Sequence, residues 1–247
     1  MNWLVGVLIL VFGGLLVWLG GRRVTLPRRA SFEEIDDPAV GQAYDRISRW
    51  PQFHFLRAMI IRKLTYYSPA GTLADIGCGP GYLVVRIAQR FSHLQVIGVD
   101  NSGEMIEIAR VNAERIQLSG QVSYRFGDVI HLPFGDGELD FAVSTASLHH
   151  WSEPGKGLAE ISRVLKPGGQ LLLFDLRRDP PGIFLGILRF AMAMVVPRAL
   201  RQAGEPLGSV QASYTPTEVE ALLAASPFKR STVQGGFAWY FAWAKKE

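Results

Sequence analysis

The chain has 247 residues, of which 48% are hydrophobic and 19% charged, and its formal net charge is +4 at pH 7. The apolar content excludes a disordered chain, and a single cysteine, Cys78, excludes a disulfide scaffold or a thiolate-rich metal site. The length allows one large domain more readily than two full ones.

The N-terminus is uncharged up to Arg22, and every residue in the range 3–21 is apolar or glycine. As a helix this run would be about 28 Å long, close to the thickness of the hydrocarbon core of a bilayer. Trp3 and Trp18 lie near its ends, where indole rings favour the membrane interface. No basic residue precedes the run and no A-x-A-like site follows it, which disfavours a cleaved signal peptide. The sequence therefore predicts a membrane anchor over residues 3–21, with a core helix that is apolar on every face as the alternative.

Residues 22–40 have mixed charge and two prolines, which predicts a basic linker. Four arginines stand near its start, and no acid precedes Glu33. They are Arg22, Arg23, Arg28 and Arg29. The positive-inside tendency places the N-terminus outside and the large domain in the cytoplasm, and the same arginines would attract anionic lipid. A linker that is simply solvated is the alternative.

Residues 41–247 are predicted to form one domain. A helical pattern from Ala39 to Leu64 is interrupted at Pro51, and short apolar runs then alternate with helical stretches. The expected strands are Thr72–Ile76, Gln95–Asp100, Val122–Phe126, Leu139–Ser144 and Gln170–Asp175, and the helices between them are Gly81–Phe91, Gly103–Leu118 and Pro154–Leu165. Apolar strands that alternate with helices predict an α/β fold with a doubly wound parallel sheet covered on both faces.

After the fifth expected strand, residues 182–196 form an apolar stretch with one charge, Arg189. The stretch is too short to span a bilayer comfortably. It is either an amphipathic helix packed on the sheet or a helix that rests on a membrane surface. Thr215 and Glu218 then begin a capped helix, and two strands joined at Gly235-Gly236 close the domain.

A glycine-rich turn follows the first expected strand, with Gly77, Gly79 and Gly81 in G-x-G-x-G spacing and Asp75 two residues before them. Glycines at such a turn let the backbone approach a ligand closely, at dihedral angles that other residues avoid. The dinucleotide-binding fingerprint has the different spacing G-x-G-x-x-G. Taken alone, the motif also fits a tight connection from strand to helix that binds no ligand.

A carboxylate, Asp100, stands at the end of the second expected strand. An acid in this register accepts hydrogen bonds from a ribose diol. Asp100 could instead cap the following helix, but Ser102 is better placed as the cap of the helix that carries Met105. Ribose binding is therefore the favoured interpretation of Asp100.

With these two elements the sequence resembles the class I S-adenosylmethionine-dependent methyltransferases, in particular their small-molecule, type 11-like subgroup. The resemblance covers residues 70–180 and continues through further motifs. These are Gly127-Asp128-Val129, Leu132-Pro133-Phe134, Leu139–Val143 and Glu160–Gly169. The resemblance implies S-adenosylmethionine as the cofactor and a mostly parallel, seven-stranded Rossmann-like sheet whose last strand is antiparallel. Residues 70–180 would then bind the cofactor, and residues 181–212 would form an insertion that covers the acceptor.

The resemblance also implies which residues form the cofactor site. Asp100 would bind the ribose, with Asn101 close by. Asp128 would meet the adenine amino group and Met105 the adenine ring, although a helical methionine is also common in a core. The full set of expected cofactor-binding residues is Asp75, Gly77, Cys78, Gly79, Gly81, Asp100, Asn101, Met105, Asp128, Val129 and Ser144. Carboxylates suit a cationic sulfonium, whereas a pyrophosphate would require basic residues, which disfavours a Rossmann oxidoreductase that uses NAD.

Two adjacent histidines, His149 and His150, lie in the loop after Ser144, which the family places beside the transferable methyl group. A histidine there can take a proton from an acceptor hydroxyl or thiol, because an unperturbed imidazole has a pKa of about 6.5. His149 is the candidate base. Alternatively, one histidine packs and the other faces solvent, since methyl transfer can depend largely on positioning. No acid or histidine stands at helical i+4 spacing, so no metal site is expected.

The sequence thus predicts a membrane-anchored methyltransferase that acts on a small or lipid-like acceptor at the cytoplasmic membrane surface. The apolar stretch at 182–196, where the acceptor should enter, favours an apolar acceptor. The alternatives are the NAD oxidoreductase and a non-catalytic, membrane-tethered scaffold. Nucleic acid is not expected as a partner, because no Asn/Asp-Pro-Pro-aromatic motif follows the fourth strand and no extended basic groove is evident. The sequence leaves open which atom is methylated and what the oligomeric state is.

Overall fold

The computed structural model describes residues 21–30, 38–118 and 120–247. Apart from Gly21, the predicted anchor at residues 3–21 lies outside the described residues, as do residues 31–37 of the expected linker. Within the described ranges, no helix is both long and apolar enough to cross a membrane.

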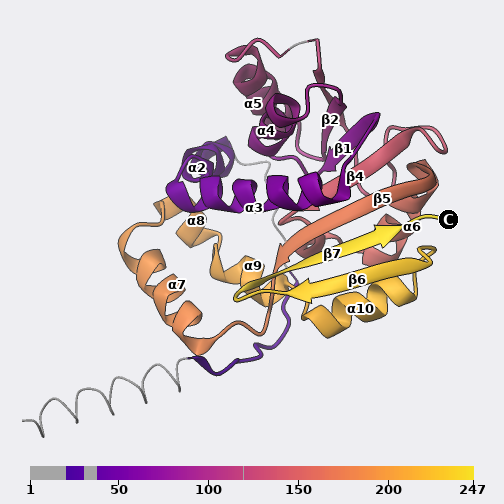
Figure 1. Cartoon of the computed structure of the whole chain (residues 1–247). Coiled ribbons are helices and arrows are strands. Elements are labelled where there is room, and N and C mark those ends of the chain that lie inside the picture. Colours follow the sequence, from indigo (N-terminus) through magenta and orange to yellow (C-terminus); the bar gives the residue numbers. More distant parts are fainter. Residues whose placement is uncertain (1–20, 31–37, 119) are drawn as a thin grey trace, which may run out of the picture.

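Seven strands form one sheet in the order β3-β2-β1-β4-β5-β7-β6 (Figure 1). Their bounds are β1 Thr72–Ile76, β2 Gln95–Asp100, β3 Val122–Phe126, β4 Leu139–Thr145, β5 Leu165–Leu176, β6 Arg230–Gly235 and β7 Trp239–Lys245. β7 pairs antiparallel with β5 and β6, and the other neighbouring pairs are parallel. The predicted doubly wound, mostly parallel sheet with an antiparallel last strand is confirmed. The strand order reverses between β1 and β4, and in such sheets ligands bind outside the carboxyl ends of the strands at this point.

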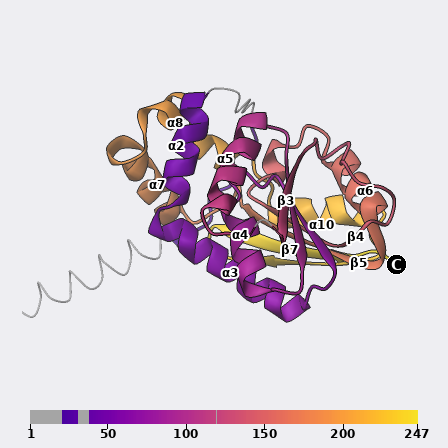
Figure 2. The same ribbon diagram turned by 90° about the horizontal axis from the view of Figure 1, so that it is seen from above.

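Helices cover both faces of the sheet (Figure 2). Their bounds are α2 Pro38–Ser48, α3 Pro51–Tyr67, α4 Tyr82–Arg90, α5 Gly103–Glu114, α6 Pro154–Val164, α7 Gly182–Met194, α8 Arg198–Gln202, α9 Leu207–Ala212 and α10 Pro216–Ala224, with a 3-10 turn, η1, at Leu148–His150. Pro51 lies in the first turn of α3, where its missing N–H costs no helical hydrogen bond. The predicted break between the first two helices is therefore confirmed.

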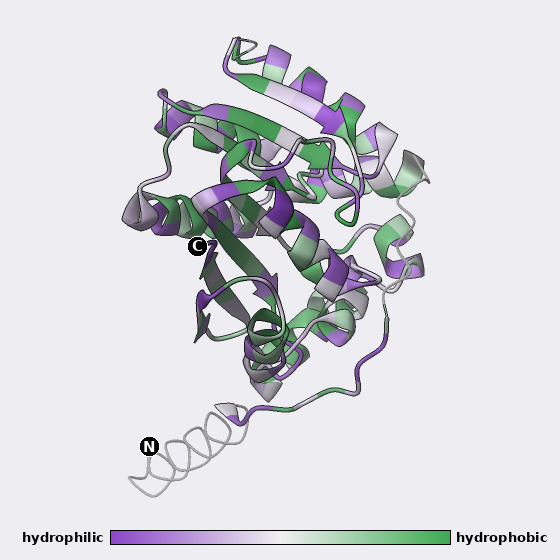
Figure 3. Cartoon of the chain, turned by 90° about the vertical axis from the view of Figure 1, so that its right-hand side faces the viewer, coloured by the Kyte–Doolittle hydropathy of each residue, from purple (hydrophilic) through white to green (hydrophobic). Residues whose placement is uncertain are grey.

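Each face of the sheet has its own apolar core, because alternate residues of a strand point to opposite faces. In β5, Leu171 and Leu173 pack with residues of α6 and α10, whereas Leu172 and Phe174 pack with residues of α3, α4 and α5. Figure 3 shows long apolar stretches in the strands, while the helices carry both apolar and polar residues. Burial on both faces explains the continuous apolar runs that predict these strands.

Residues 22–29, here called the N-terminal strap, lie along the segment between β5 and α7 and then along the end of α9. Backbone hydrogen bonds join the strap to this segment in the pairs Val24–Pro180, Leu26–Arg178 and Arg22–Gly182. The guanidinium of Arg23 donates to three backbone carbonyls, those of Asp179, Gly236 and Phe237. The first part of the expected linker is thus attached to the domain, beside the start of α7 (Figure 1).

Candidate functional site

The glycine turn between β1 and α4 is the centre of the candidate site. Gly77, Gly79 and Gly81 have φ angles of 75°, 51° and 76°, which glycine adopts readily and other residues rarely do. The N–H groups of Gly77 and Cys78 both donate to the Val99 carbonyl, at 2.8 and 2.9 Å. The turn is therefore fixed to the carboxyl end of β2.

A pair of glycine variants separates the packing of this turn from its open side. A Cβ at Gly77 would lie 2.3 Å from Ser147 Oγ, whereas a Cβ at Gly79 would meet no atom within 4 Å. Gly77→Ala is expected to destabilise the fold by about 1–2 kcal/mol of backbone strain and about 1–3 kcal/mol of overpacking. Gly79→Ala is expected to add only the backbone strain. The alanine side chain would also occupy open space in the turn, so we expect it to weaken binding of S-adenosylmethionine. Thermal unfolding and calorimetry measure the two effects, and equal losses of stability would contradict the packing argument.

Asp100, the last residue of β2, is joined to the turn by its own carboxylate. Its Oδ2 accepts a hydrogen bond from the Gly79 N–H at 2.7 Å, and its Oδ1 accepts one from the Ser102 N–H at 3.0 Å. Ser102 is the N-cap of α5, since its Oγ accepts from the N–H of the buried Met105. This confirms the expected cap. Burial raises the pKa of Asp100, and the backbone N–H donors oppose that rise.

Asp75 lies one residue before the end of β1 and is 1% exposed. Its Oδ1 is buried and has no hydrogen-bond partner among the described residues. Burial raises the pKa of Asp75 well above its usual range, and the negative charge of Asp100 adds to the rise. A buried carboxylate without a donor is unfavourable, so this position favours a ligand that brings positive charge or an N–H group. Asp75 and Asp100 therefore fit a cationic cofactor such as S-adenosylmethionine.

Asp75→Asn is expected to stabilise the ligand-free protein at neutral pH and to weaken cofactor binding. The pKa of Asp75 is raised in the folded state, so the proton on its carboxyl group stabilises the fold. This contribution is fully present below about pH 3.9, the pKa of aspartate in the unfolded chain. That contribution is lost as the pH rises through the raised folded pKa. The asparagine loses no proton, so the advantage of the variant should grow with pH, to on the order of 1–3 kcal/mol. Unfolding curves of both proteins from about pH 4 to about pH 8 test this, and a constant difference would contradict it.

Three other expected cofactor residues lie at the carboxyl edge of β2 and β3. The Gly127 N–H donates to the backbone oxygen of Asp100 at 3.0 Å, which holds the following Asp128 at this edge. The Asp128 carboxylate is exposed and accepts from the Ile130 N–H at 3.0 Å. Asn101 is exposed and Val129 is partly buried. The structure thus brings the expected ribose and adenine positions to one edge of the sheet.

Two expected residues, Ser144 and Cys78, are buried in the fold. The Ser144 hydroxyl donates to the Ile76 carbonyl at 2.7 Å, which ties β4 to β1. Burial raises the pKa of the Cys78 thiol well above its usual range, and the charges of Asp100 and Asp75 add to the rise. Ser144 therefore uses its hydrogen within the sheet, and Cys78 is not a thiolate nucleophile at neutral pH.

His149 lies in η1, on the loop after β4, and is 3% exposed. Its Nδ1 is 2.7 Å from Oδ1 of Asp175, and its backbone N–H donates to Oδ2 of the same carboxylate at 3.1 Å. A carboxylate accepts hydrogen bonds, so the geometry assigns a proton to Nδ1, and in the neutral tautomer Nε2 is the nitrogen with the lone pair. Nε2 is buried and has no hydrogen-bond partner among the described residues. Nε2 is therefore the ring nitrogen that could accept a proton from a group placed within hydrogen-bond distance of it.

Asp175 is a candidate site residue that the sequence alone does not single out. It is fully buried near the end of β5, and it also accepts the Leu176 N–H at 2.7 Å. The one sequence feature that points to Asp175 is its position as an acid directly after an apolar run. Burial lowers the pKa of the neighbouring His150 to about 3, and the adjacent His149 contributes to the shift. No group of three or more His, Cys, Asp or Glu in the described ranges is placed to hold a metal ion.

The loop that carries His149 is held between the glycine turn and the insertion after β5. Ser147 lies against Gly77 and accepts a hydrogen bond from Trp151 Nε1 at 3.0 Å. α9, which belongs to the insertion, packs against η1. The candidate base thus lies between the expected cofactor turn and the segment expected to cover the acceptor.

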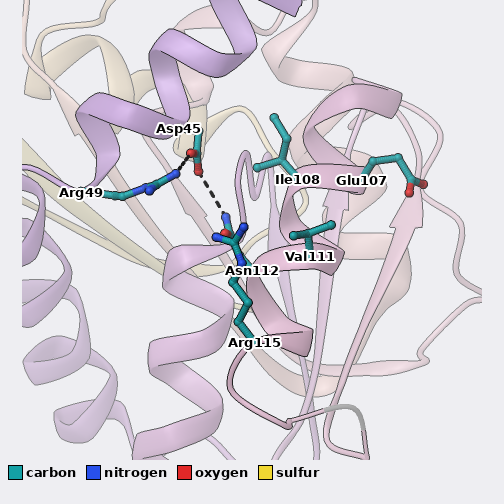
Figure 4. Close-up of a pocket in the computed structure, with 7 residues that line it drawn as sticks. All are labelled: Asp45, Arg49, Glu107, Ile108, Val111, Asn112 and Arg115. Atoms are coloured by element: carbon teal, nitrogen blue, oxygen red, sulfur yellow. Dashed lines mark hydrogen bonds and ion pairs between the residues drawn. The ribbon is translucent and has the colours of Figure 1, made fainter.

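A separate hollow of about 290 Å³ lies between α2 and α5 (Figure 4). It is lined by Asp45, Arg49, Glu107, Ile108, Val111, Asn112 and Arg115, none of them an expected site residue. The Asn112 amide donates to the Pro80 carbonyl at 3.0 Å and to Asp45 Oδ1 at 3.3 Å. These contacts hold α2 and α5 against the glycine turn, and the residues that make them also line the hollow.

Known proteins resemble the chain over this region. A family model described as a methyltransferase domain matches residues 74–173. The demethylmenaquinone methyltransferase of Thermus thermophilus is 30% identical over 166 residues, which cover 67% of this chain and 74% of that protein. The O-methyltransferase cnsE of Penicillium expansum is 38% identical over 109 residues, which cover 44% of this chain and 39% of that protein. The chain spans less than two thirds of the length of this and of other curated relatives.

A solved structure shows the same fold. The SAM-dependent methyltransferase from Aquifex aeolicus superimposes with a TM-score of 0.60 at 18% sequence identity, over 87% of this chain and 96% of that one. Together with the G-x-G-x-G turn and the two buried aspartates, these matches exclude the NAD oxidoreductase and confirm the predicted cofactor. The chain belongs to the S-adenosylmethionine-dependent methyltransferases.

Proposed function

We propose that this methyltransferase acts on a small, apolar acceptor with an ionisable hydroxyl, of the quinol type, at the cytoplasmic surface of a membrane. The observation that carries the proposal is the buried pair of His149 and Asp175, with Nε2 of His149 free to accept a proton. The name of the Thermus thermophilus relative, a demethylmenaquinone methyltransferase, supports a quinol-type acceptor.

The cofactor would be held at the carboxyl edge of β1, β2 and β3. Asp100 would accept hydrogen bonds from the ribose, and Gly79 would let the backbone approach closely. When bound, S-adenosylmethionine supplies a methyl group on a cationic sulfonium. The positive charge would favour the ionised form of Asp75, which burial otherwise disfavours.

His149 would act on the acceptor by taking the proton of its hydroxyl at Nε2. The Asp175 carboxylate holds Nδ1–H, so it would keep the ring in the correct tautomer and stabilise the imidazolium that forms. Removal of this proton makes the acceptor a stronger nucleophile. Asp175 would thus be a positioning residue, and His149 the residue that touches the substrate.

The membrane location rests on the apolar residues 3–21 and on the arginines that follow them. A helical anchor of this length with a basic flank would place the N-terminus outside and the domain in the cytoplasm. An acceptor with an isoprenoid or acyl tail would be concentrated in the same membrane, which fits an apolar substrate.

A screen with a labelled methyl donor tests the acceptor class directly. Quinols, phospholipid head groups and alkyl thiols are offered to the full chain in lipid, and the labelled product is identified by mass spectrometry. We expect label on the quinols, and less in His149→Gln. Label confined to head groups or thiols would overturn the proposed acceptor, and binding of the cofactor without turnover on any of them would favour the non-catalytic scaffold.

A further inference from the structure

One face of α7 exposes apolar side chains to solvent. Ile183, Ile187, Phe190 and Met194 are spaced by four, three and four residues, which places them on one side of a helix. Ile187 is 61% exposed and Phe190 68%. In this helix only Leu185 is buried. A continuous apolar surface of this kind is uncommon on a monomeric soluble protein and marks a contact with a partner or a membrane.

The charges around this stripe are basic. Arg189, Arg198 and Arg201 are exposed, and no acid occurs in the sequence between Asp179 and Glu205. The two acids at the borders are not available, because Asp179 is bound by Arg177 and Glu205 is buried. An apolar stripe bordered by arginines is complementary to the surface of an anionic lipid bilayer.

The described chain begins at the same place. The Gly182 N–H at the start of α7 donates to the Arg22 carbonyl at 2.9 Å. Arg22 follows the uncharged residues 3–21 directly. Arg23 fixes this point through its hydrogen bonds to three carbonyls of the domain. The described chain therefore begins at the N-terminal end of α7 (Figure 1).

We infer that the stripe formed by Ile183, Ile187, Phe190 and Met194 docks on an anionic bilayer, with α7 lying in the plane of the interface. This inference rests on the proposed membrane location. Helices of this kind bury their apolar side about 5–10 Å into the boundary between head groups and acyl chains. α7 and α9 belong to one insertion, and α9 packs against η1, which carries His149. Docking would therefore place the cover of the acceptor site on the lipid that supplies the acceptor.

The experiment uses the full chain in vesicles of neutral and anionic phospholipid that contain a lipid with a nitroxide on its acyl chain. Phe190→Cys carries an environment-sensitive dye, and Ile187→Cys repeats the measurement on the same face. The native Cys78 is buried, so the dye selects the new cysteine. The matched control is Tyr66→Cys, because Tyr66 is 79% exposed and lies at the far end of α3, before β1 begins. Calorimetry with S-adenosylmethionine verifies that each labelled protein is folded.

We expect the nitroxide lipid to quench the dye at positions 187 and 190 by roughly twofold or more, and to leave the dye at position 66 nearly unchanged. Omission of the anionic lipid should reduce the quenching.

A carbonate wash tests the anchor separately. Protein that resists the wash without quenching at 187 and 190 overturns the docking and leaves the membrane location standing. Protein that is washed off, but whose dye was quenched beforehand, supports the docking and overturns the anchor. A shift in the fluorescence emission of the dye that depends on protein concentration and not on lipid means that a second copy covers the stripe. This result overturns the inference.

Discussion

Replacement of His149 by glutamine is expected to lower kcat for methyl transfer by roughly 10²–10⁴-fold and to leave the affinity for S-adenosylmethionine unchanged. The side chain is buried, its Nδ1 is 2.7 Å from Asp175, and its Nε2 has no partner among the described residues, so Nε2 is the ring nitrogen left to accept a proton. Glutamine fills a similar volume but cannot take that proton. Single-turnover rates with the acceptor from the screen, together with calorimetry of the cofactor, measure the two quantities.

Two further variants separate proton transfer from packing. His150→Gln should change kcat far less, because burial already lowers the pKa of His150 to about 3 and makes it a poor base near neutral pH. Asp175→Asn should slow the reaction and alter its pH profile, since an amide can hold the ring in the wrong tautomer. Melting curves show whether either variant is unfolded. A kcat for His149→Gln within about twofold of the wild type would mean that the reaction depends on positioning alone.

Asp100→Ala is the second change for which we expect a large effect, a loss of affinity for S-adenosylmethionine of about 100-fold or more. Hydrogen bonds to a charged group contribute about 1.5–3 kcal/mol each, and a ribose diol can make two of them. The alanine also removes the acceptor of the Gly79 N–H, so the turn loses one of its hydrogen bonds to β2 and keeps those to the Val99 carbonyl. Calorimetry with S-adenosylmethionine and with the product S-adenosylhomocysteine measures the effect.

Glu107→Ala is the matched control for the loss of one negative charge. Glu107 lies on α5, its side chain is 69% exposed, and it pairs with Arg110 on the same helix. Its removal should leave the affinity nearly unchanged. An Asp100→Ala protein that is folded and binds the cofactor as tightly as the control would show that Asp100 does not hold the ribose.

The strands and the glycine turn could be predicted because their signals are local. The bounds of β1, β2 and β3 agree with the expected ranges, since short apolar runs ending in glycine or aspartate mark them. The capping box of Thr215 and Glu218 is likewise present. These features depend on residues that are close together in the sequence, so the local sequence is sufficient to predict them.

What could not be predicted depends on contacts between distant residues. Asp175 meets His149 across 26 residues, and nothing in the sequence links an acid near a strand end to one particular histidine. The Ser144 hydroxyl donates to the Ile76 carbonyl across 68 residues, and no local signal in the sequence marks this contact. The helices α8 and α9 have five and six residues, too few for a helical period to be visible.

The hydrogen bonds of Arg23 have a consequence for the order in which the protein is made. Arg23 and Gly236 are 213 residues apart in the chain. A ribosome synthesises Arg23 well before its three acceptors, so the strap has no complete binding site until the β6–β7 hairpin has left the exit tunnel. Until then residues 22–29 are available to other contacts, and attachment of the strap is among the last steps that complete the domain.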